Sequence, residues 1–275
     1  MAAEDLTRLP TSVLVQRTLV LAGQEPVLQS DEYWDLVRLL HFRSGRELFD
    51  TSVELCSSQD PISRAVGADI LAQLGVQAGM AAYPFADESE GRLVALLTDT
   101  EPVVAASALY ALGHLGRGEP SELAGLAKHA SEDVRCALAY ALGGRDDAIS
   151  IAALIELCGD TDTDARNWAT FALGSLSEED SPAIRDALAA RLSDADDEIR
   201  GEAILGLAKR ADDRVLQPLE RELSGREVGT LAIEAAEALP RPEFIPHLEA
   251  LYAANPGDQV IEQALNRCRE VAKRR

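Results

Sequence analysis

The feature that most constrains this chain is an internal repeat. Five ten-residue segments align without gaps, and each begins with an apolar residue and ends in a sequence similar to Ala-Leu-Gly. They are 104–113, 134–143, 165–174, 199–208 and 231–240, so their last residues stand 30, 31, 34 and 32 positions apart. A sixth copy is expected at 66–75, which is 38 positions before the first of the five. A period in this range is typical of chains built from stacked helical or mixed units.

Each period has room for two helices. Apolar residues recur at three- and four-residue spacing within the copies, which is typical of a helix that buries one face. Second amphipathic stretches lie between them, at 121–129, 148–158, 182–192, 215–223 and 244–253. The chain is 47% hydrophobic but only 4% aromatic, so its core must consist mainly of aliphatic side chains. We therefore predict an all-α fold.

Acidic turns precede several of the repeated segments, at 131–133, 160–164 and 193–198. Carboxylates at such positions cap free N–H groups and complement the helix dipole. The turn at 160–164 has the alternating acids that open a calcium loop. However, Ala165 stands where the turn glycine is needed, and Phe171 stands where the bidentate glutamate belongs. No metal site is therefore expected.

Paired helices at a period near 31 resemble the HEAT repeat, in particular the short type of the phycobilisome lyases, whose pattern is Val-Arg-x-x-Ala-x-x-Ala-Leu-Gly. Arg135, Arg166 and Arg200 occupy the arginine position, whereas Ala105 and Ala232 replace the arginine and Arg64 lies two residues before Val66. The resemblance implies a right-handed α-α superhelix of the HEAT or armadillo type, with about six helix pairs and capping helices. We predict one solenoid over 1–275. Its predicted parts are the N-terminal capping helices and first repeat helix at 1–58, stacked repeats at 59–254 and a C-terminal capping helix at 255–275.

The arginines of the pattern have two interpretations. A functional arginine would bind an anion, whereas a structural one would pair with an acidic turn of the neighbouring repeat. We favour the second for Arg135, Arg166 and Arg200, because a residue that recurs once per repeat serves a need that every repeat shares. Bidentate arginine–carboxylate geometry meets that need.

The seventh position of each copy is expected on the concave side of the solenoid. Successive copies place Tyr110, Tyr140, Phe171, Leu205 and Glu237 there, with Trp168 one turn earlier in the copy at 165–174. Exposed aromatic residues in a groove are common anchors of protein interfaces. The alternative, weighed equally, is that the rings fill gaps between repeats. The predicted groove is completed by His114, Asn167, Glu202 and Glu234, with Ser175, Lys209 and Arg241 nearby.

The charge balance bears on the partner. The chain has 26 basic and 47 acidic residues, a net charge of −21, which disfavours binding to nucleic-acid phosphates. Solubility of a small domain needs a charge magnitude of only about 2–8. The excess equally suits solubility and the attraction of a basic partner protein. No stretch has the length of a membrane span and the N-terminal residues are unlike a signal peptide, so we expect a cytoplasmic monomer.

Signatures of catalysis are missing from the sequence. The four histidines have no partner at a recognised spacing, and the absence of any His-Glu dipeptide counts against the iron-dependent HEAT-repeat hydroxylases. The segment 113–118 resembles a phosphate-binding loop, but Glu119 and Pro120 follow where Lys and Ser or Thr are required. We expect a protein that is not an enzyme and holds no cofactor.

A second resemblance is more specific. The segments Arg166-Asn-Trp-Ala169, Glu202-Ala-Ile204 and Glu234-Ala-Ala236 resemble a bacterial HEAT-repeat family associated with Rhs-type polymorphic toxin loci, over about 45–265. Members are regarded as immunity proteins, which implies that this chain binds and neutralises a toxin domain. An acidic groove would suit a basic toxin. The alternatives are a lyase-like binder of a bilin or another small ligand, for which Cys136 is the predicted groove cysteine, and a scaffold for other proteins.

Overall fold

The computed structural model describes residues 6–24, 30–43, 45–77 and 83–274. All regular structure within these ranges is helical, with sixteen α-helices and no strand. Short 3₁₀ segments lie at Leu6–Arg8, Asp213–Val215 and Pro242–Phe244, and one π-helical turn spans Ala172–Leu176. The predicted all-α fold class is therefore confirmed. Among the described helices, none is both long enough and apolar enough to cross a membrane.

The helices form two compact units, residues 1–142 and 143–275. Unit 1 contains α1 (Thr11–Ala22), α2 (Asp31–His41), α3 (Arg46–Leu55), α4 (Pro61–Leu71), α5 (Ala86–Leu96), α6 (Pro102–Leu115), α7 (Pro120–Ala124) and α8 (Glu132–Leu142). Unit 2 contains α9 (Ala148–Leu157), α10 (Thr163–Phe171), α11 (Pro182–Ala189), α12 (Asp197–Lys209), α13 (Leu216–Leu223), α14 (Thr230–Ala238), α15 (Ile245–Ala254) and α16 (Gln259–Lys273). The continuity of the two units as one solenoid stays a prediction.

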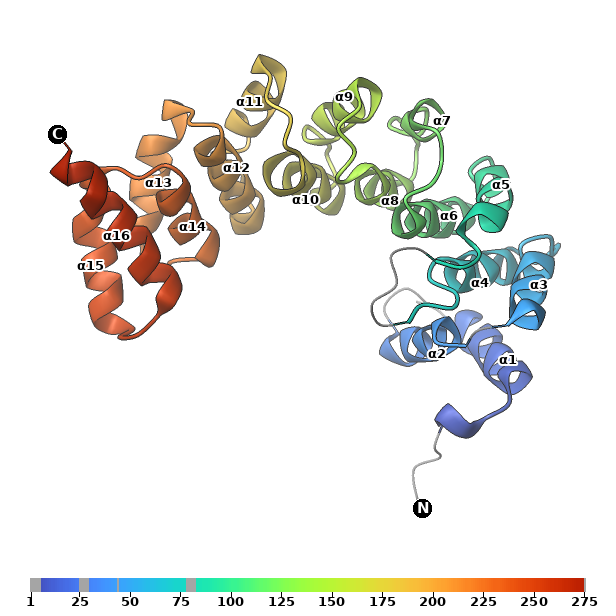
Figure 1. Ribbon diagram of the computed structural model, residues 1–275. Coiled ribbons are helices and arrows are strands. Elements are labelled where there is room, and N and C mark those ends of the chain that lie inside the picture. Colours follow the sequence, from blue (N-terminus) through green and yellow to red (C-terminus); the bar gives the residue numbers. More distant parts are fainter. Residues whose placement is uncertain (1–5, 25–29, 44, 78–82, 275) are drawn as a thin grey trace. The chain divides into compact units, whose positions relative to one another are not determined.

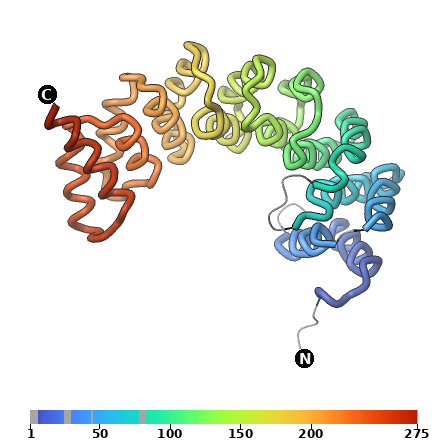
Figure 2. The backbone as a smooth tube through the Cα atoms, viewed as in Figure 1, coloured from blue at the N-terminus to red at the C-terminus, as the bar shows by residue number. Residues whose placement is uncertain are grey.

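Each unit is a stack of helix pairs. Every odd-numbered helix packs against the even-numbered helix that follows it. The even-numbered helices also pack on one another, α2 to α8 in unit 1 and α10 to α16 in unit 2. Figure 1 shows the two layers within each unit, and Figure 2 shows the chain passing from one layer to the other. We call the layer of even-numbered helices the even layer, and its surface away from the odd-numbered helices the open face.

The predicted repeat segments at 104–240 all lie on even-numbered helices, and the predicted second stretches lie on odd-numbered ones. Two details differ. The helix expected at 121–129 ends at Ala124, where Gly125 follows, because glycine is a weak helix former. The predicted capping helices also pair, α1 with α2 and α15 with α16, so the described chain has eight helix pairs rather than about six with separate caps.

Aspartates fix the starts of several helices. The side chains of five of them accept hydrogen bonds from backbone N–H groups at the start of α4, α9, α10, α12 and α16: Asp60, Asp147, Asp162, Asp196 and Asp258. Such caps satisfy donors that have no partner within the helix. Asp162 and Asp196 belong to the predicted acidic turns, so the capping role of these turns is confirmed.

Candidate functional site

The repeat arginines hold the turns together. Arg166 donates from Nε and Nη2 to the two carboxylate oxygens of Asp194, at 2.9 and 3.3 Å, and from Nη1 to the carbonyl oxygen of Asp160 at 2.8 Å. Asp194 lies in the turn before α12, in the next repeat, so this is the contact that a structural ladder requires. Arg200 and Arg135 also donate from Nη1 to carbonyl oxygens five and six residues earlier in the chain.

Arg64 belongs to the same ladder. Its Nη1 donates to the carbonyl oxygens of Ser58 and Gln59, again six and five residues earlier, and its Nε lies 2.7 Å from Asp99 Oδ2. The first copy of the repeat therefore begins at Ser63, and the predicted start at Val66 was wrong. The apolar residues from Ala65 onwards also fit the repeat pattern in a later alignment, which is why the sequence placed the start of this copy at Val66. With this correction, Asp69 takes the seventh position of its copy.

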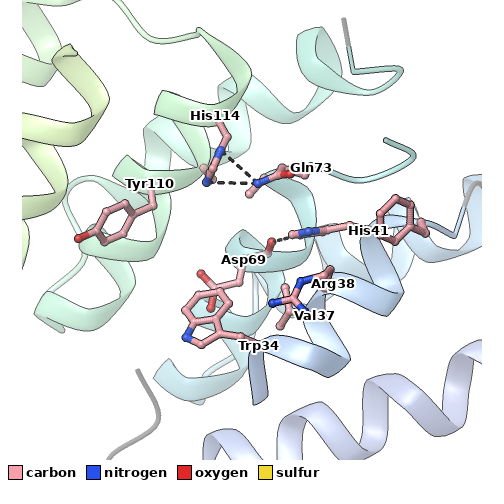
Figure 3. Close-up of a pocket in the computed structure, with 11 residues that line it drawn as sticks. Trp34, Val37, Arg38, His41, Asp69, Gln73, Tyr110 and His114 are labelled. Atoms are coloured by element: carbon pink, nitrogen blue, oxygen red, sulfur yellow. Dashed lines mark hydrogen bonds between the residues drawn. The ribbon is translucent and has the colours of Figure 1, made fainter. Parts of the chain in front are cut away.

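Asp69 lines a hollow in the open face of unit 1. The hollow has a volume of about 560 Å³ and lies among α2, α4 and α6 (Figure 3). It is lined by Trp34, Val37, Arg38, His41, Phe42, Asp69, Ala72, Gln73, Tyr110, Ala111 and His114. Only Tyr110 and His114 were predicted from the sequence.

The floor of this hollow carries buried titratable groups. Asp69 is 6% exposed, and its Oδ2 accepts a hydrogen bond of 2.5 Å from the hydroxyl of Tyr33. Burial raises the pKa of Asp69 to about 6, although hydrogen bonds from Tyr33 and Ser107 act in the opposite direction. His41 donates from Nε2 to the carbonyl oxygen of Asp69 at 2.8 Å. Burial lowers the pKa of His41 to about 4, so this imidazole is neutral at pH 7.

Beside the hollow, the predicted aromatic residues of unit 1 form a cluster. The rings of Tyr110 and Tyr140 lie 5.3 Å apart between centroids, and the Tyr140 hydroxyl lies 3.0 Å from Nδ1 of His114. The amide of Gln73 hydrogen-bonds the same imidazole at 3.1 Å. Both tyrosines are half-buried. Each tyrosine therefore contacts a neighbouring repeat and keeps part of its surface exposed, and its contact with a partner stays a prediction.

Unit 2 has a smaller hollow of about 180 Å³, lined by Asn167, Trp168, Phe171, Glu198 and Glu202. Trp168 is 37% exposed and meets Phe171 edge to face, with 5.9 Å between ring centroids. The amide of Asn167 donates to Glu198 Oε2 at 3.0 Å. The Ser175 hydroxyl donates to Glu202 Oε2 at 2.6 Å.

Glu202 sits among other acids. Burial raises its pKa, and the nearby charges of Glu198 and Glu234 raise it further, whereas Ser175 and Lys209 lower it. Glu234 is exposed, and Glu237 is half-buried with Oε1 at 3.6 Å from Arg267 Nε. Leu205 is only 3% exposed, so the expectation that it would contact a partner was wrong.

Residues that the sequence analysis missed come mainly from α2. Trp34 and His41 lie on α2, which the sequence marked only as a cap, and Phe42 follows its last residue. Asp69 and Gln73 were missed because the first copy was aligned three residues too late. The arginine ladder was the available signal, since aligning Arg64 with Arg135 places Asp69 with Tyr140 at the seventh position.

Within the described ranges, no three His, Cys, Asp or Glu side chains converge to hold a metal ion. A lyase-like function would be favoured by a large hollow that contains a reactive cysteine. Cys136 is not among the residues that line the 560 Å³ hollow, and its Sγ lies 3.5 Å from the Tyr110 hydroxyl.

Comparison with known proteins fits this architecture. Residues 120–184 match the family model for HEAT repeats. Over 244 residues the chain is 30% identical to protein YibA of Escherichia coli K12, and the match covers 84% of this chain and 83% of YibA. The chain belongs to the YibA family of HEAT-repeat proteins. The X-ray structure of E. coli YibA is similar over 95% of this chain and 97% of that one, with a TM-score of 0.69 and 27% identity.

An engineered protein also shares the fold of this YibA-family chain, with a TM-score of 0.55 and 18% identity over 96% of this chain and 81% of that one. The segment Arg166 to Ala169, the most specific part of the family resemblance, lies on α10. Its Asn167 and Trp168 form one wall of the hollow in unit 2, with Phe171 and Glu202 beside them. Three residues of the segments that carry the family resemblance, Asn167, Trp168 and Glu202, therefore line one hollow.

Proposed function

We propose that this YibA-family protein is a non-catalytic binding protein whose open face receives a basic partner. We further propose that the partner is a Rhs-type toxin domain, which the protein neutralises as an immunity protein in the cytoplasm. The observation that carries the proposal is the hollow in unit 2, where a partly exposed tryptophan lies beside two glutamates.

Tryptophan is suited to anchor a partner, because it offers a large contact area at low conformational cost and is enriched among interface hot spots. The T-shaped contact with Phe171 holds the Trp168 ring in place. A basic side chain of a partner could stack on the indole and pair with a carboxylate at the same time. This combination favours a basic protein over a neutral one.

The distribution of ion pairs supports the same surface. Acids along the turns of unit 2 are already paired: Asp194 with Arg166, Asp180 with Arg185 and Asp213 with Arg241. By contrast, Glu198 and Glu234 form no ion pair within the described part of the chain. Their negative charge is therefore available to a partner.

The proposal predicts that Trp168→Ala weakens partner binding while the helices stay folded. Loss of an interface anchor costs at least about 2 kcal/mol, which is roughly a 30-fold loss of affinity. The measurement is a pull-down from the native host, at low and high salt, with quantification by mass spectrometry. Circular dichroism of each variant verifies the fold.

Ile149→Ala is the matched control, because Ile149 is 47% exposed on α9, in the odd-numbered layer of the same unit. We expect capture of the partner to be unchanged in this variant and to decrease at high salt in the wild type. Equal capture by Trp168→Ala and Ile149→Ala would show that the open face of unit 2 is not the binding surface.

Immunity is tested separately by co-expression with a toxin domain encoded beside the gene. We expect wild-type protein to restore growth and Trp168→Ala to restore it less. Partner capture without growth protection would refute immunity and leave the scaffold function. Retention of a coloured or other small ligand in place of a protein would favour the lyase-like alternative.

A further inference from the structure

The hollow in unit 1 contains a buried carboxylate without a balancing cation. Asp69 accepts hydrogen bonds from the hydroxyls of Tyr33 and Ser107, which are neutral donors. Within the described residues, Asp69 takes part in no ion pair. A buried charge is costly unless it is paired, so the site favours a ligand that supplies the missing positive charge.

Other charged groups of the hollow leave this imbalance in place. Arg38 lies at its edge, and its Nη1 donates to Asp35 Oδ1 at 2.8 Å. Burial lowers the pKa of His41 to about 4, and partial desolvation lowers the pKa of His114, so both rings are neutral at pH 7. The pKa of Asp69 is about 6, so its carboxyl group is mainly ionised at pH 7.5.

The walls of the hollow suit the apolar stem of a cation. Figure 3 shows the Asp69 side chain next to the indole of Trp34, with Tyr110 on the neighbouring helix α6. Val37, Ala72 and Ala111 add apolar surface. Aromatic faces attract cations, and the attraction strengthens where water is excluded. Phe42, which is 62% exposed, adds further apolar surface to the lining.

We propose that this hollow is a binding site for an organic cation, a guanidinium or ammonium group carried on an alkyl stem. The cation donates hydrogen bonds to the Asp69 carboxylate, and the stem packs against Trp34 and Tyr110. This site is distinct from the hollow of unit 2, and the inference does not depend on the proposed function.

The test uses the full chain with Trp168→Phe, which leaves Trp34 as the only tryptophan, since the sequence contains two. Its fluorescence is titrated with butylguanidinium and with butylurea, a neutral molecule of nearly the same shape. Binding is measured at pH 7.5 for this protein and for two further variants of it. Asp69→Asn removes the buried charge, and Asp50→Asn removes an equal charge from the exposed surface of α3, outside the hollow.

We expect saturable binding of butylguanidinium, with butylurea at least about tenfold weaker, because the neutral urea cannot form a charge-assisted hydrogen bond with Asp69. Asp69→Asn should weaken butylguanidinium binding by a similar factor, and Asp50→Asn should not change it. Equal binding of the two ligands, unchanged binding by Asp69→Asn or the absence of saturable binding would each overturn the proposal. If Asp69→Asn does not fold, the comparison of the two ligands on the parent protein still decides.

The cation could be free or part of a protein. A second pair of titrations therefore uses acetyl-Gly-Arg-Gly-amide and the same tripeptide with citrulline. Binding of the arginine peptide over the citrulline peptide assigns the site to a basic side chain of a protein. Binding of butylguanidinium without the arginine peptide assigns it to a free small molecule, since the peptide backbone then fails to fit.

Discussion

Two buried titratable residues, Asp69 and His41, meet at one backbone carbonyl in unit 1. Their effects on stability run in opposite directions. The fold raises the pKa of Asp69 from 3.8 to about 6, so its protonated form is favoured, and this contribution is complete below pH 3.8 and lost as the pH rises to 6. The fold lowers the pKa of His41 from 6.5 to about 4, so its contribution is complete above pH 6.5 and lost as the pH falls to 4.

Asp69→Asn should reveal the pH dependence of stability that arises from His41. Each pKa shift corresponds to about 3 kcal/mol of stability. Between pH 4 and pH 6.5 one contribution falls while the other rises, so their pH dependences nearly cancel in the wild type. In Asp69→Asn only that of His41 remains. The free energy of unfolding of the variant, relative to the wild type, should therefore rise by about 3 kcal/mol from pH 4 to pH 6.5. Urea denaturation across this pH range is the measurement, and a constant difference between the two proteins would contradict the opposing roles.

At the scale of elements, unit 2 has an unusually close helix contact. A Cβ atom placed on Gly174 would lie 2.7 Å from the carbonyl oxygen of Glu202, and one on Gly206 would lie 2.6 Å from the Gly174 Cα. The π-helical turn Ala172–Leu176 therefore approaches the backbone of α12 at a distance that only glycine permits. A similar close approach lies in unit 1, where a Cβ atom placed on Gly113 would lie 2.9 Å from the Cα of Ala141.

Arg210 stabilises this contact through hydrogen bonds. It is 9% exposed, and its Nη2 donates to the carbonyl oxygens of Leu173, Ser177 and Glu179 at 2.8–3.0 Å. These carbonyls lie in or just after the π-helical turn, where helical partners are missing. The guanidinium of Arg210, at the end of α12, thus provides hydrogen-bond donors for carbonyl groups at the end of the preceding even-numbered helix.

Gly174→Ala tests the packing. The added methyl group must displace backbone, so we expect the free energy of unfolding to fall by about 2 kcal/mol. Gly91→Ala is the opposite case, since nothing lies within 4 Å of a Cβ atom at this position in α5. It should raise stability by about 0.5–1 kcal/mol because alanine is the better helix former. Urea denaturation measures both, and equal effects would show that backbone approach does not govern Gly174.

At the scale of the whole molecule, the net charge of −21 acts on stability as well as on binding. Like charges repel in the compact state, and salt screens this repulsion. The exposed ion pairs, such as Arg38–Asp35 and Arg46–Asp50, contribute little that salt could remove.

We therefore expect Tm to rise by a few degrees between about 20 mM and about 500 mM KCl, as the Debye length shrinks. Differential scanning calorimetry is the measurement. A matched titration with a neutral osmolyte separates charge screening from general effects on solvation. A lower Tm at high salt would mean that attractive ion pairs outweigh the repulsion.

The sequence by itself determined the all-α repeat fold, the placement of most helices and the aspartate caps of the acidic turns before α10 and α12. These features depend on periodicity and on contacts within a few residues, both of which can be recognised in the sequence. The same locality allowed Trp168, Asn167 and Glu202 to be predicted together, since they lie on two successive copies of one pattern.

Only the tertiary structure decided which residues share a hollow and which side chains are exposed. The site around Asp69 joins α2 to α6, and Trp34 and Tyr110 are far apart in the chain with no shared motif. Leu205 and Phe171 hold the same repeat position, yet Leu205 is buried and Phe171 is partly exposed. Exposure differs because it is set by the neighbouring helices, which differ from copy to copy, and a single helix pattern does not contain that information.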